Sequence, residues 1–444
     1  MSRLLKSQDY LMKYLGVFLL FGFISLGAIG GCSDNDSNQD EITPSHVFEF
    51  TSPSVEVQGR QLIVNGNPVL LKAIDYSPVP IGSFPPGSNI PSDSCIYQRD
   101  SQLLNGSGAN FLRLYGMIPE TDPGINQLGA DNNIFLGLGF PLLPYTIQFC
   151  GSQPQRPDGT TFCIKGNALN QSLDPSTADG MALRNMIKAD FTDYYKRTCN
   201  ISQNCFYIVG NEVSNGSDYN FSKFKDDPSN FYSLINEIAA IPETAEVLKD
   251  CPDPFPLTTA IIDLNDLQNP DIKTDDNTMS NMKFWSSNVY RGCKDATGCN
   301  GSGSCEIPAM TNFYSSFKTL TKKPVFISEY GIDAYDNMSR VVDETTQASC
   351  TTAIWRSIET NWLSGSSTQV AIGGAVFEYT DEWWKTDGNP NAQGTGGFPN
   401  PNFPDGFQNE SYFGLFSISD NPGTCNKLTP RQVFTTLSNA WNMP

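Results

Sequence analysis

The sequence contains very little histidine: its 444 residues include one, His46. Mechanisms of the Ser-His-Asp or Cys-His type need a histidine as general base, and His46 lies beside a polar N-terminal segment. Zinc sites use closely spaced histidines, cysteines and carboxylates. The nearest cysteine cluster, Cys293, Cys299 and Cys305, is spaced by six and six residues among glycine, serine and asparagine, which is not such a pattern. We therefore expect no metal ion and no cofactor.

Basic residues are scarce as well. The chain has 28 lysines and arginines against 47 aspartates and glutamates, a formal net charge of −19. Nucleic acids select basic protein surfaces, so this composition argues against a nucleic-acid partner. It fits an exported protein that acts on a neutral polymer. A glycine-rich phosphate loop is missing after the first predicted strand, which disfavours an open nucleotide-binding sheet.

A long hydrophobic run lies near the N-terminus, between a basic start and Cys32. Its length and glycine content are typical of a signal peptide over 1–31 rather than of a membrane span. The letters IGG before Cys32 resemble the lipobox of bacterial lipoproteins, which implies lipidation at Cys32. A polar, flexible tether over 32–46 then precedes a catalytic domain over 47–444. We expect export to a bacterial cell envelope with a lipid anchor in the membrane, and plain secretion is the alternative.

Cysteine is abundant, with twelve residues, and export makes disulfides the better account of them. Two local pairs are candidates, Cys199 with Cys205 and Cys150 with Cys163. If Cys32 is lipidated, eleven cysteines are left, so at least one thiol is unpaired or pairs between molecules.

Eight short apolar segments, mostly separated by amphipathic stretches, indicate repeated βα units. The predicted strands are 70–78, 110–116, 132–144, 205–213, 256–264, 283–292, 323–331 and 370–384. Helices are predicted between them, for example over 177–198 and 351–363. An Asn65-Gly66 turn indicates a short N-terminal β-hairpin. The predicted fold is α/β, a (β/α)8 barrel, in which catalytic groups lie at the C-terminal ends of the strands.

Two of these strands end in a glutamate. Glu212 follows the letters FYIVGN at the end of the fourth strand, and Glu329 follows the letters KPVFIS at the end of the seventh. One such glutamate alone more often caps a helix or pairs with an arginine. Two at the same barrel mouth match glycoside cleavage, which needs one protonated and one ionised carboxyl group. In retaining enzymes the two groups lie about 5–5.5 Å apart.

The letters GNEV around Glu212 and SEYG around Glu329 resemble the clan A superfamily of retaining glycoside hydrolases. Within it, LLKAIDYSP, CIYQRDSQLLNGSGANFLRLYG, NVYRGC and IGGAVFEYTDEWW resemble glycoside hydrolase family 72, the β-1,3-glucanosyltransferases of fungal cell walls. The resemblance implies Glu212 as general acid/base and Glu329 as nucleophile. It also implies a covalent glycosyl-enzyme, a β-1,3-glucan substrate and transfer of the sugar to an acceptor.

Other residues near the strand ends are candidates for supporting roles. Asn211 can donate to the sugar 2-hydroxyl, and Arg113 and Tyr290 can hold Glu329 ionised and oriented. The candidates for contact with sugar are Tyr76, Asn211, Tyr290, Glu378, Tyr379, Trp383 and Trp384. For the Trp383–Trp384 pair, a packed aromatic cluster is the alternative.

Two alternative functions stay open. One is an endo-β-glycanase of the same superfamily, a mannanase- or cellulase-like hydrolase. The other is a non-catalytic, carbohydrate-binding surface lipoprotein, which predicts a broken carboxylate pair.

Overall fold

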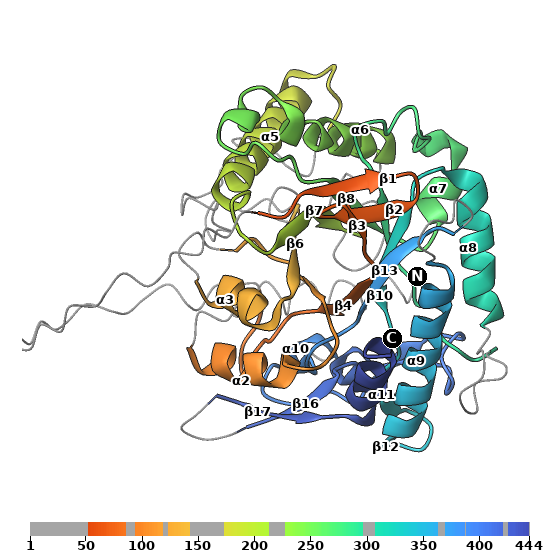
Figure 1. Ribbon diagram of the computed structural model, residues 1–444. Helices are drawn as coiled ribbons and strands as arrows, with labels where there is room; N and C mark the ends of the chain where they lie inside the picture. The colour runs from red at the N-terminus through yellow and green to blue at the C-terminus, as the bar shows by residue number, and fades with distance from the viewer. Residues whose placement is uncertain are drawn as a thin grey trace, which may run out of the picture.

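The computed structural model describes residues 52–85, 94–118, 123–142, 173–212, 227–295, 307–362, 369–386, 388–420 and 425–443. Eight parallel strands close into a barrel with helices outside it (Figure 1), which confirms the predicted (β/α)8 fold. In chain order the strands are β4 (Leu71–Asp75), β5 (Phe111–Arg113), β6 (Phe135–Phe140), β7 (Asn204–Asn211), β8 (Leu257–Ile262), β9 (Trp285–Asn288), β10 (Val325–Tyr330) and β13 (Ala371–Val376). Seven of these strands fall within segments predicted from the sequence, and β7 begins one residue before its predicted segment.

The helices outside the barrel include five where the sequence predicts them. The bounds are α2 (Ser94–Leu104), α3 (Pro123–Asn132), α5 (Ala178–Thr198), α6 (Pro228–Ala239), α8 (Pro308–Leu320), α9 (Glu344–Thr360) and α11 (Gln432–Trp441). Side-chain oxygens of Thr177, Asp227 and Asp343 cap α5, α6 and α9 by accepting from backbone N–H groups of the first turn. Helices α3 and α11 were not predicted. The sequence of α3, PGINQLGADN, has two glycines and few apolar residues.

Aromatic rings fill the inside of the barrel. Phe111 of β5 stacks on Phe206 of β7 at a centroid distance of 4.8 Å, and Phe326 of β10 lies 5.5 Å from Phe206. These strands are not neighbours in the sheet, so the rings meet in the interior. Gly137 of β6 makes room for them, because a Cβ there would lie 2.4 Å from the Phe111 ring. Both sheet faces are buried, which explains the continuous apolar runs in the sequence.

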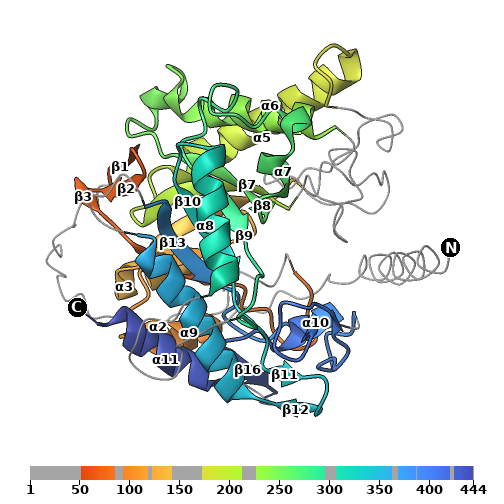
Figure 2. The same cartoon turned by 90° about the vertical axis from the view of Figure 1, so that its right-hand side faces the viewer.

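Two accessory units flank the barrel. At the N-terminal side, β1 (Val55–Gln58) pairs with β2 (Gln61–Val64), and a turn at Asn65-Gly66 leads to β3 (Asn67–Pro68). This confirms the predicted hairpin. At the C-terminal side, β16 (Phe416–Ser419) and β17 (Lys427–Pro430) form a second hairpin that leads into α11. Helix α11 packs along α9 (Figure 2).

The disulfides differ from the sequence prediction. Cys199 pairs with Cys251, and Cys205 is free and buried, so the predicted Cys199–Cys205 pair is wrong. Cys199 caps the end of α5, whereas Cys205 lies within the barrel wall on β7, and the loop after α6 brings Cys251 to Cys199 instead. The other bonds between described residues are Cys95–Cys425 and Cys293–Cys350.

Several sequence predictions fall outside the described residues. They are the signal peptide over 1–31, lipidation at Cys32, the tether over 32–46 and the Cys150–Cys163 pair.

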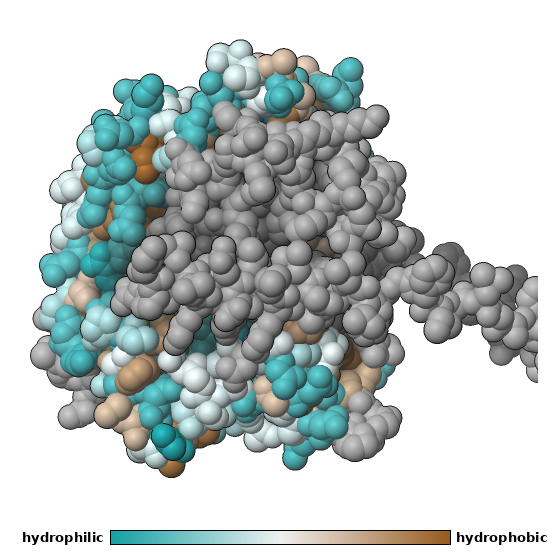
Figure 3. Space-filling model, turned by 180° about the vertical axis from the view of Figure 1, so that it is seen from behind, coloured by the Kyte–Doolittle hydropathy of each residue, from teal (hydrophilic) through white to brown (hydrophobic). Residues whose placement is uncertain are grey.

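One face of the protein is predominantly polar. In the view of Figure 3, hydrophilic residues cover most of the coloured area and apolar residues are scattered among them. In the described ranges no helix combines the length and the apolarity needed to cross a bilayer.

Candidate active site

The two glutamates lie at the C-terminal rim of the barrel. Glu329 is the fifth residue of β10, and Glu212 directly follows β7. The chain turns sharply at Glu212, where Gly210 has a φ of 74° and Glu212 a φ of 53°. A left-handed backbone is costly for a residue other than glycine and is characteristic of functional sites. The Glu212 N–H donates to the Ala260 carbonyl at 2.8 Å, which ties this turn to β8.

Three donors surround the Glu329 carboxylate. Arg113 donates through Nη1 to Oε1 at 2.9 Å, and the Tyr115 hydroxyl donates to the same oxygen at 2.7 Å. The Tyr290 hydroxyl donates to Oε2 at 2.7 Å. Glu329 is buried, with 5% of its surface exposed. These three hydrogen bonds hold the Glu329 carboxyl group in one orientation.

Arg113 joins three strands of the barrel. Besides Glu329, its guanidinium donates to the Ser328 carbonyl at 2.6 Å and to Asn211 Oδ1 at 2.6 Å. It also lies over the Tyr115 ring, 4.3 Å from the centroid. Burial by itself would lower the pKa of Arg113, but Tyr115, Asp75 and Glu329 outweigh it and the pKa is raised. Arg113 is therefore a permanent cation at the centre of the site.

Asn288 on β9 connects the two halves of the site. Its Nδ2 donates to Glu212 Oε1 at 2.7 Å and to Asn211 Oδ1 at 3.1 Å. Its own Oδ1 accepts from the Ser328 hydroxyl at 2.7 Å. Because Asn211 Oδ1 accepts from both Arg113 and Asn288, the Asn211 amide is oriented with Nδ2 on the other side. Asn211 is an exposed residue at the C-terminal end of β7.

Glu212 has the opposite electrostatic environment from Glu329. Burial, and then the negative charge of Glu329, raise the pKa of Glu212 to about 7. The hydrogen bond from Asn288 lowers it, and the charge of Glu410 raises it further. Below neutral pH this group carries a proton. One carboxyl group of the site therefore has a proton to donate, and the other is fixed by three hydrogen-bond donors.

Asp75, at the end of β4, lies behind Arg113. Its Oδ1 is 3.3 Å from Arg113 Nη1, and the whole residue is buried. Burial and the charge of Glu329 raise the pKa of Asp75 well above its usual range, although Arg113 opposes the shift. A protonated Asp75 does not compete with Glu329 for the charge of Arg113.

Three residues of the site were not assigned a role from the sequence. They are Asp75, Tyr115 and Asn288. For Asn288 a signal exists in NVYRGC, where the asparagine stands two residues before Tyr290. Asp75 and Tyr115 each follow an apolar strand, as Glu212 does. Their contacts arise only when the barrel closes.

The aromatic residues expected to contact sugar are mostly inside the protein. Tyr76 and Tyr379 are fully buried, with ring centroids 4.9 Å apart, and the Tyr76 hydroxyl donates to Asp100 Oδ2 at 2.7 Å. Trp384 is 8% exposed, whereas Trp383 is half-buried. Neither tyrosine therefore offers an open ring face, and of these four residues Trp383 has the most accessible ring.

Glu378 is fully buried just after β13. Burial, and then the neighbouring Glu382, raise the pKa of Glu378 well above its usual range, so the group is a neutral acid. Glu382 accepts from the Ser77 hydroxyl at 3.0 Å and lies 2.9 Å from Lys385 Nζ. Lys385 Nζ in turn lies 4.3 Å from the centroid of the Phe377 ring. The part of the chain that the structure describes contains no group of three or more histidine, cysteine or acidic side chains placed to hold a metal ion.

Comparisons by sequence return nothing: the chain matches no protein-family model and no curated protein. Comparisons by structure do. A β-glucuronidase from Ruminococcus gnavus matches with a TM-score of 0.51 and 14% identity, over 88% of this chain and 53% of that one. A GH2 β-galacturonidase from Eisenbergiella tayi, bound to galacturonate, matches with a TM-score of 0.51 and 12% identity, over 88% and 54%. The chain thus spans about half the length of these proteins. The likeness shows the fold.

Proposed function

We propose that the protein is a retaining glycosidase that works by double displacement. Glu329 is the nucleophile and Glu212 the general acid/base. The observation that carries this assignment is the contrast between the two carboxyl groups: three donors bind and orient Glu329, whereas burial and the charge of Glu329 raise the pKa of Glu212 to about 7. Glycoside cleavage by this mechanism needs one oriented nucleophile and one carboxyl group that carries a proton.

The proposed reaction has two steps. In the first, Glu329 attacks the anomeric carbon to form a covalent ester while Glu212 protonates the departing oxygen. In the second, ionised Glu212 takes a proton from a hydroxyl group, whose oxygen attacks the same carbon and releases Glu329. Asn211 Nδ2 donates to the sugar 2-hydroxyl, a contact that strengthens in the transition state. Arg113, Tyr115 and Tyr290 keep the nucleophile in one orientation.

We propose a β-glucan, with β-1,3 linkages, as substrate and a second sugar as acceptor. The support is the resemblance of the sequence around Asp75, Arg113, Glu212, Tyr290 and Glu329 to family 72 glucanosyltransferases. The solved neighbours are named as a β-glucuronidase and a β-galacturonidase, which supports glycosidase chemistry on this barrel but favours no glucan. Trp383, Glu378 and the other predicted sugar contacts remain secondary proposals, and burial of Tyr76, Tyr379 and Glu378 favours indirect roles for those three.

Incubation with a reduced β-1,3-gluco-oligosaccharide tests substrate and outcome together. Products longer than the substrate indicate transfer, and only shorter products indicate hydrolysis. Parallel incubations with β-1,4-gluco- and β-1,4-manno-oligosaccharides test the endo-glycanase alternative. Binding to glucan without turnover of any of the three, unchanged in the Glu212→Gln/Glu329→Gln double variant, would support the carbohydrate-binding lipoprotein instead.

We also propose that the protein is exported and anchored by a lipid on Cys32. The support is the apolar N-terminal run that ends at this cysteine. Fractionation of cells that express the full chain or its Cys32→Ala variant tests it: the native chain is expected with the membranes, and the variant is not.

A further inference from the structure

Residues 409–414, which we call the strap, cross the ends of β10 and β13 next to the site. The Glu378 N–H donates to the Phe413 carbonyl at 3.4 Å, and the Ala334 N–H donates to the Tyr412 carbonyl at 3.0 Å. At its start, the Asn409 N–H donates to Asp333 Oδ2 at 3.1 Å. The strap is thus bonded to the segments that follow both strands.

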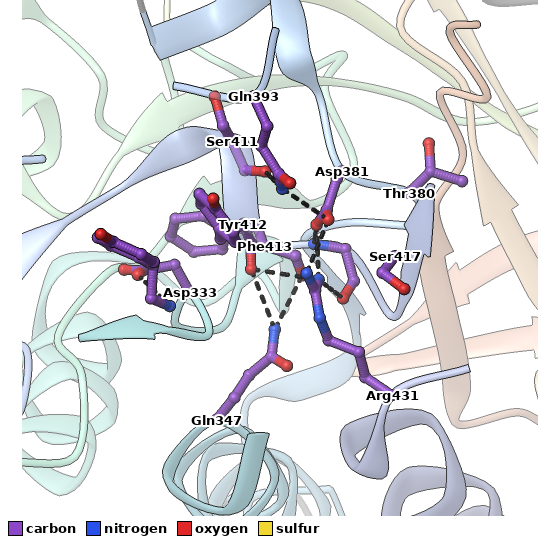
Figure 4. Close-up of polar contacts among 12 residues, drawn as sticks. Asp333, Gln347, Thr380, Asp381, Gln393, Ser411, Tyr412, Phe413, Ser417 and Arg431 are labelled. Atoms are coloured by element: carbon purple, nitrogen blue, oxygen red, sulfur yellow. Dashed lines mark hydrogen bonds and ion pairs between the residues drawn. The ribbon is translucent and has the colours of Figure 1, made fainter. Parts of the chain in front are cut away.

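A buried ion pair holds the strap from the outside (Figure 4). Arg431 donates to both oxygens of Asp381, at 2.5 and 2.7 Å, and its Nη1 also donates to the Gly414 carbonyl at 2.8 Å. The Gly414 N–H donates back to Asp381 Oδ1 at 3.1 Å. From the other side, Gln347 of α9 donates to the Phe413 carbonyl at 3.3 Å. These contacts leave the strap one defined position.

The Phe413 side chain packs against the tyrosine that binds the nucleophile. Its ring meets Tyr290 edge-on, with centroids 5.8 Å apart and an interplanar angle of 85°. Phe377 closes the other side, 5.3 Å from Phe413 and 6.1 Å from Tyr290. Tyr290 donates to Glu329 Oε2 at 2.7 Å, so the position of this hydroxyl depends on the aromatic contact behind it.

We propose that the strap positions the nucleophile: Phe413 holds the Tyr290 hydroxyl against Glu329. Phe413 is a positioning residue, not a catalytic one, and the Asp381–Arg431 pair sets its place. The inference rests on the proposed role of Glu329.

Loosening Tyr290 in Phe413→Leu removes the packing that holds its hydroxyl on Glu329 Oε2. Because a misplaced nucleophile affects the chemical step more than substrate binding, we expect a fall in kcat that is larger than any rise in KM.

A matched variant separates positioning from loss of packing. Phe416→Leu removes a buried ring next to the strap that packs on Tyr379 and Phe434 but not on Tyr290. It is expected to keep the native kcat. Arg431→Lys, which keeps the charge but cannot donate through a fork, is expected to lower kcat in the same way as Phe413→Leu.

The measurement is the steady-state kinetics of the full chain and each variant on the same oligosaccharide, with thermal unfolding in parallel. If Phe413→Leu loses stability as Phe416→Leu does but keeps the native kcat, the strap is structural only. Full activity in Glu329→Gln would instead overturn the proposed function, and it is measured separately.

Discussion

Arg113 on the second barrel strand donates to Glu329 on the seventh, at 2.9 Å, and both side chains are buried. The nucleophile is therefore oriented from inside the barrel rather than by a surface loop. The same guanidinium binds Asn211, the residue before Glu212, at 2.6 Å. One buried cation thus sets the positions of both halves of the carboxylate pair.

Azide is expected to separate the roles of the two glutamates. Glu329→Ala and Glu212→Ala should each lose activity on the order of 10³-fold or more, because each group acts in the covalent steps. With an activated β-glycoside, azide should restore turnover in both. The Glu329 variant should release the α-glycosyl azide, since azide replaces the nucleophile, and the Glu212 variant the β-glycosyl azide. NMR of the products gives the anomer, and the reverse assignment would exchange the two roles.

Arg113→Lys should lower activity strongly, although lysine keeps the positive charge. Lysine cannot donate to Glu329, Ser328 and Asn211 at once, so Glu329 loses its orientation. We expect kcat to fall by roughly 10²-fold, the effect of a misplacement of about 1 Å. Arg113→Met, which leaves buried acid groups without their cation, should cost about 3–5 kcal/mol in the free energy of unfolding. Urea unfolding and steady-state kinetics measure the two effects. A lysine variant with native kcat would contradict the orienting role.

Asn288→Ala should shift the alkaline limb of kcat/KM upward. The Asn288 amide donates to Glu212 Oε1 and lowers the pKa of Glu212, which is about 7 with the bond in place. Loss of the donor disfavours the carboxylate, so the pKa rises, by roughly one unit for a bond to a charged group. Ser287→Ala, one residue earlier on β9, is the control, because the Ser287 hydroxyl donates to the Asp263 carbonyl away from the site. Equal profiles for both variants would rule out this hydrogen bond as a determinant.

Glu212 should make the stability of the protein depend on pH. Its pKa in the folded protein is about 7, above the ordinary value of 4.5, so the folded state binds the proton more tightly than the unfolded chain. The stability that this group contributes is complete below pH 4.5 and is lost as the pH rises through 7. We expect Glu212→Gln and the native protein to differ by a constant amount in acid. At pH 8 the variant should gain roughly 1–3 kcal/mol relative to the native protein. Unfolding in urea at both pH values measures the difference. The control is Glu243→Gln, which removes an exposed carboxylate that pairs with Lys283. A difference that is the same at pH 4 and pH 8 would contradict the raised pKa.

Thiol labelling tests the corrected disulfide. Cys205 is buried, and burial raises the pKa of its thiol, so it should not react with a maleimide in the native state. After unfolding without reductant it should react, and peptide mapping should find the peptides of Cys199 and Cys251 linked. A linked Cys199–Cys205 peptide would restore the local pairing expected from the sequence.

The eight strands could be predicted because parallel barrel strands are buried on both faces and leave continuous apolar runs, such as the one before Glu329. The two glutamates stood out for the same reason, since a carboxylate directly after such a run is costly without a partner. Helix α3 lacks this local signal, because its sequence has few apolar residues. For that reason it was not predicted.

What the sequence by itself determined is the set of strands, their order and the two carboxylates at their ends, all of which depend on local periodicity and burial. The sequence also suggested Arg113 and Tyr290 as partners of Glu329. Only the tertiary structure decided the other contacts: it placed Tyr115 on Glu329 and Asn288 on Glu212, turned Tyr76 and Tyr379 into the core, and paired Cys199 with Cys251. These contacts join residues far apart in the chain. They exist because closing the barrel brings non-neighbouring strands together, and the spacing of residues along one strand carries no record of that.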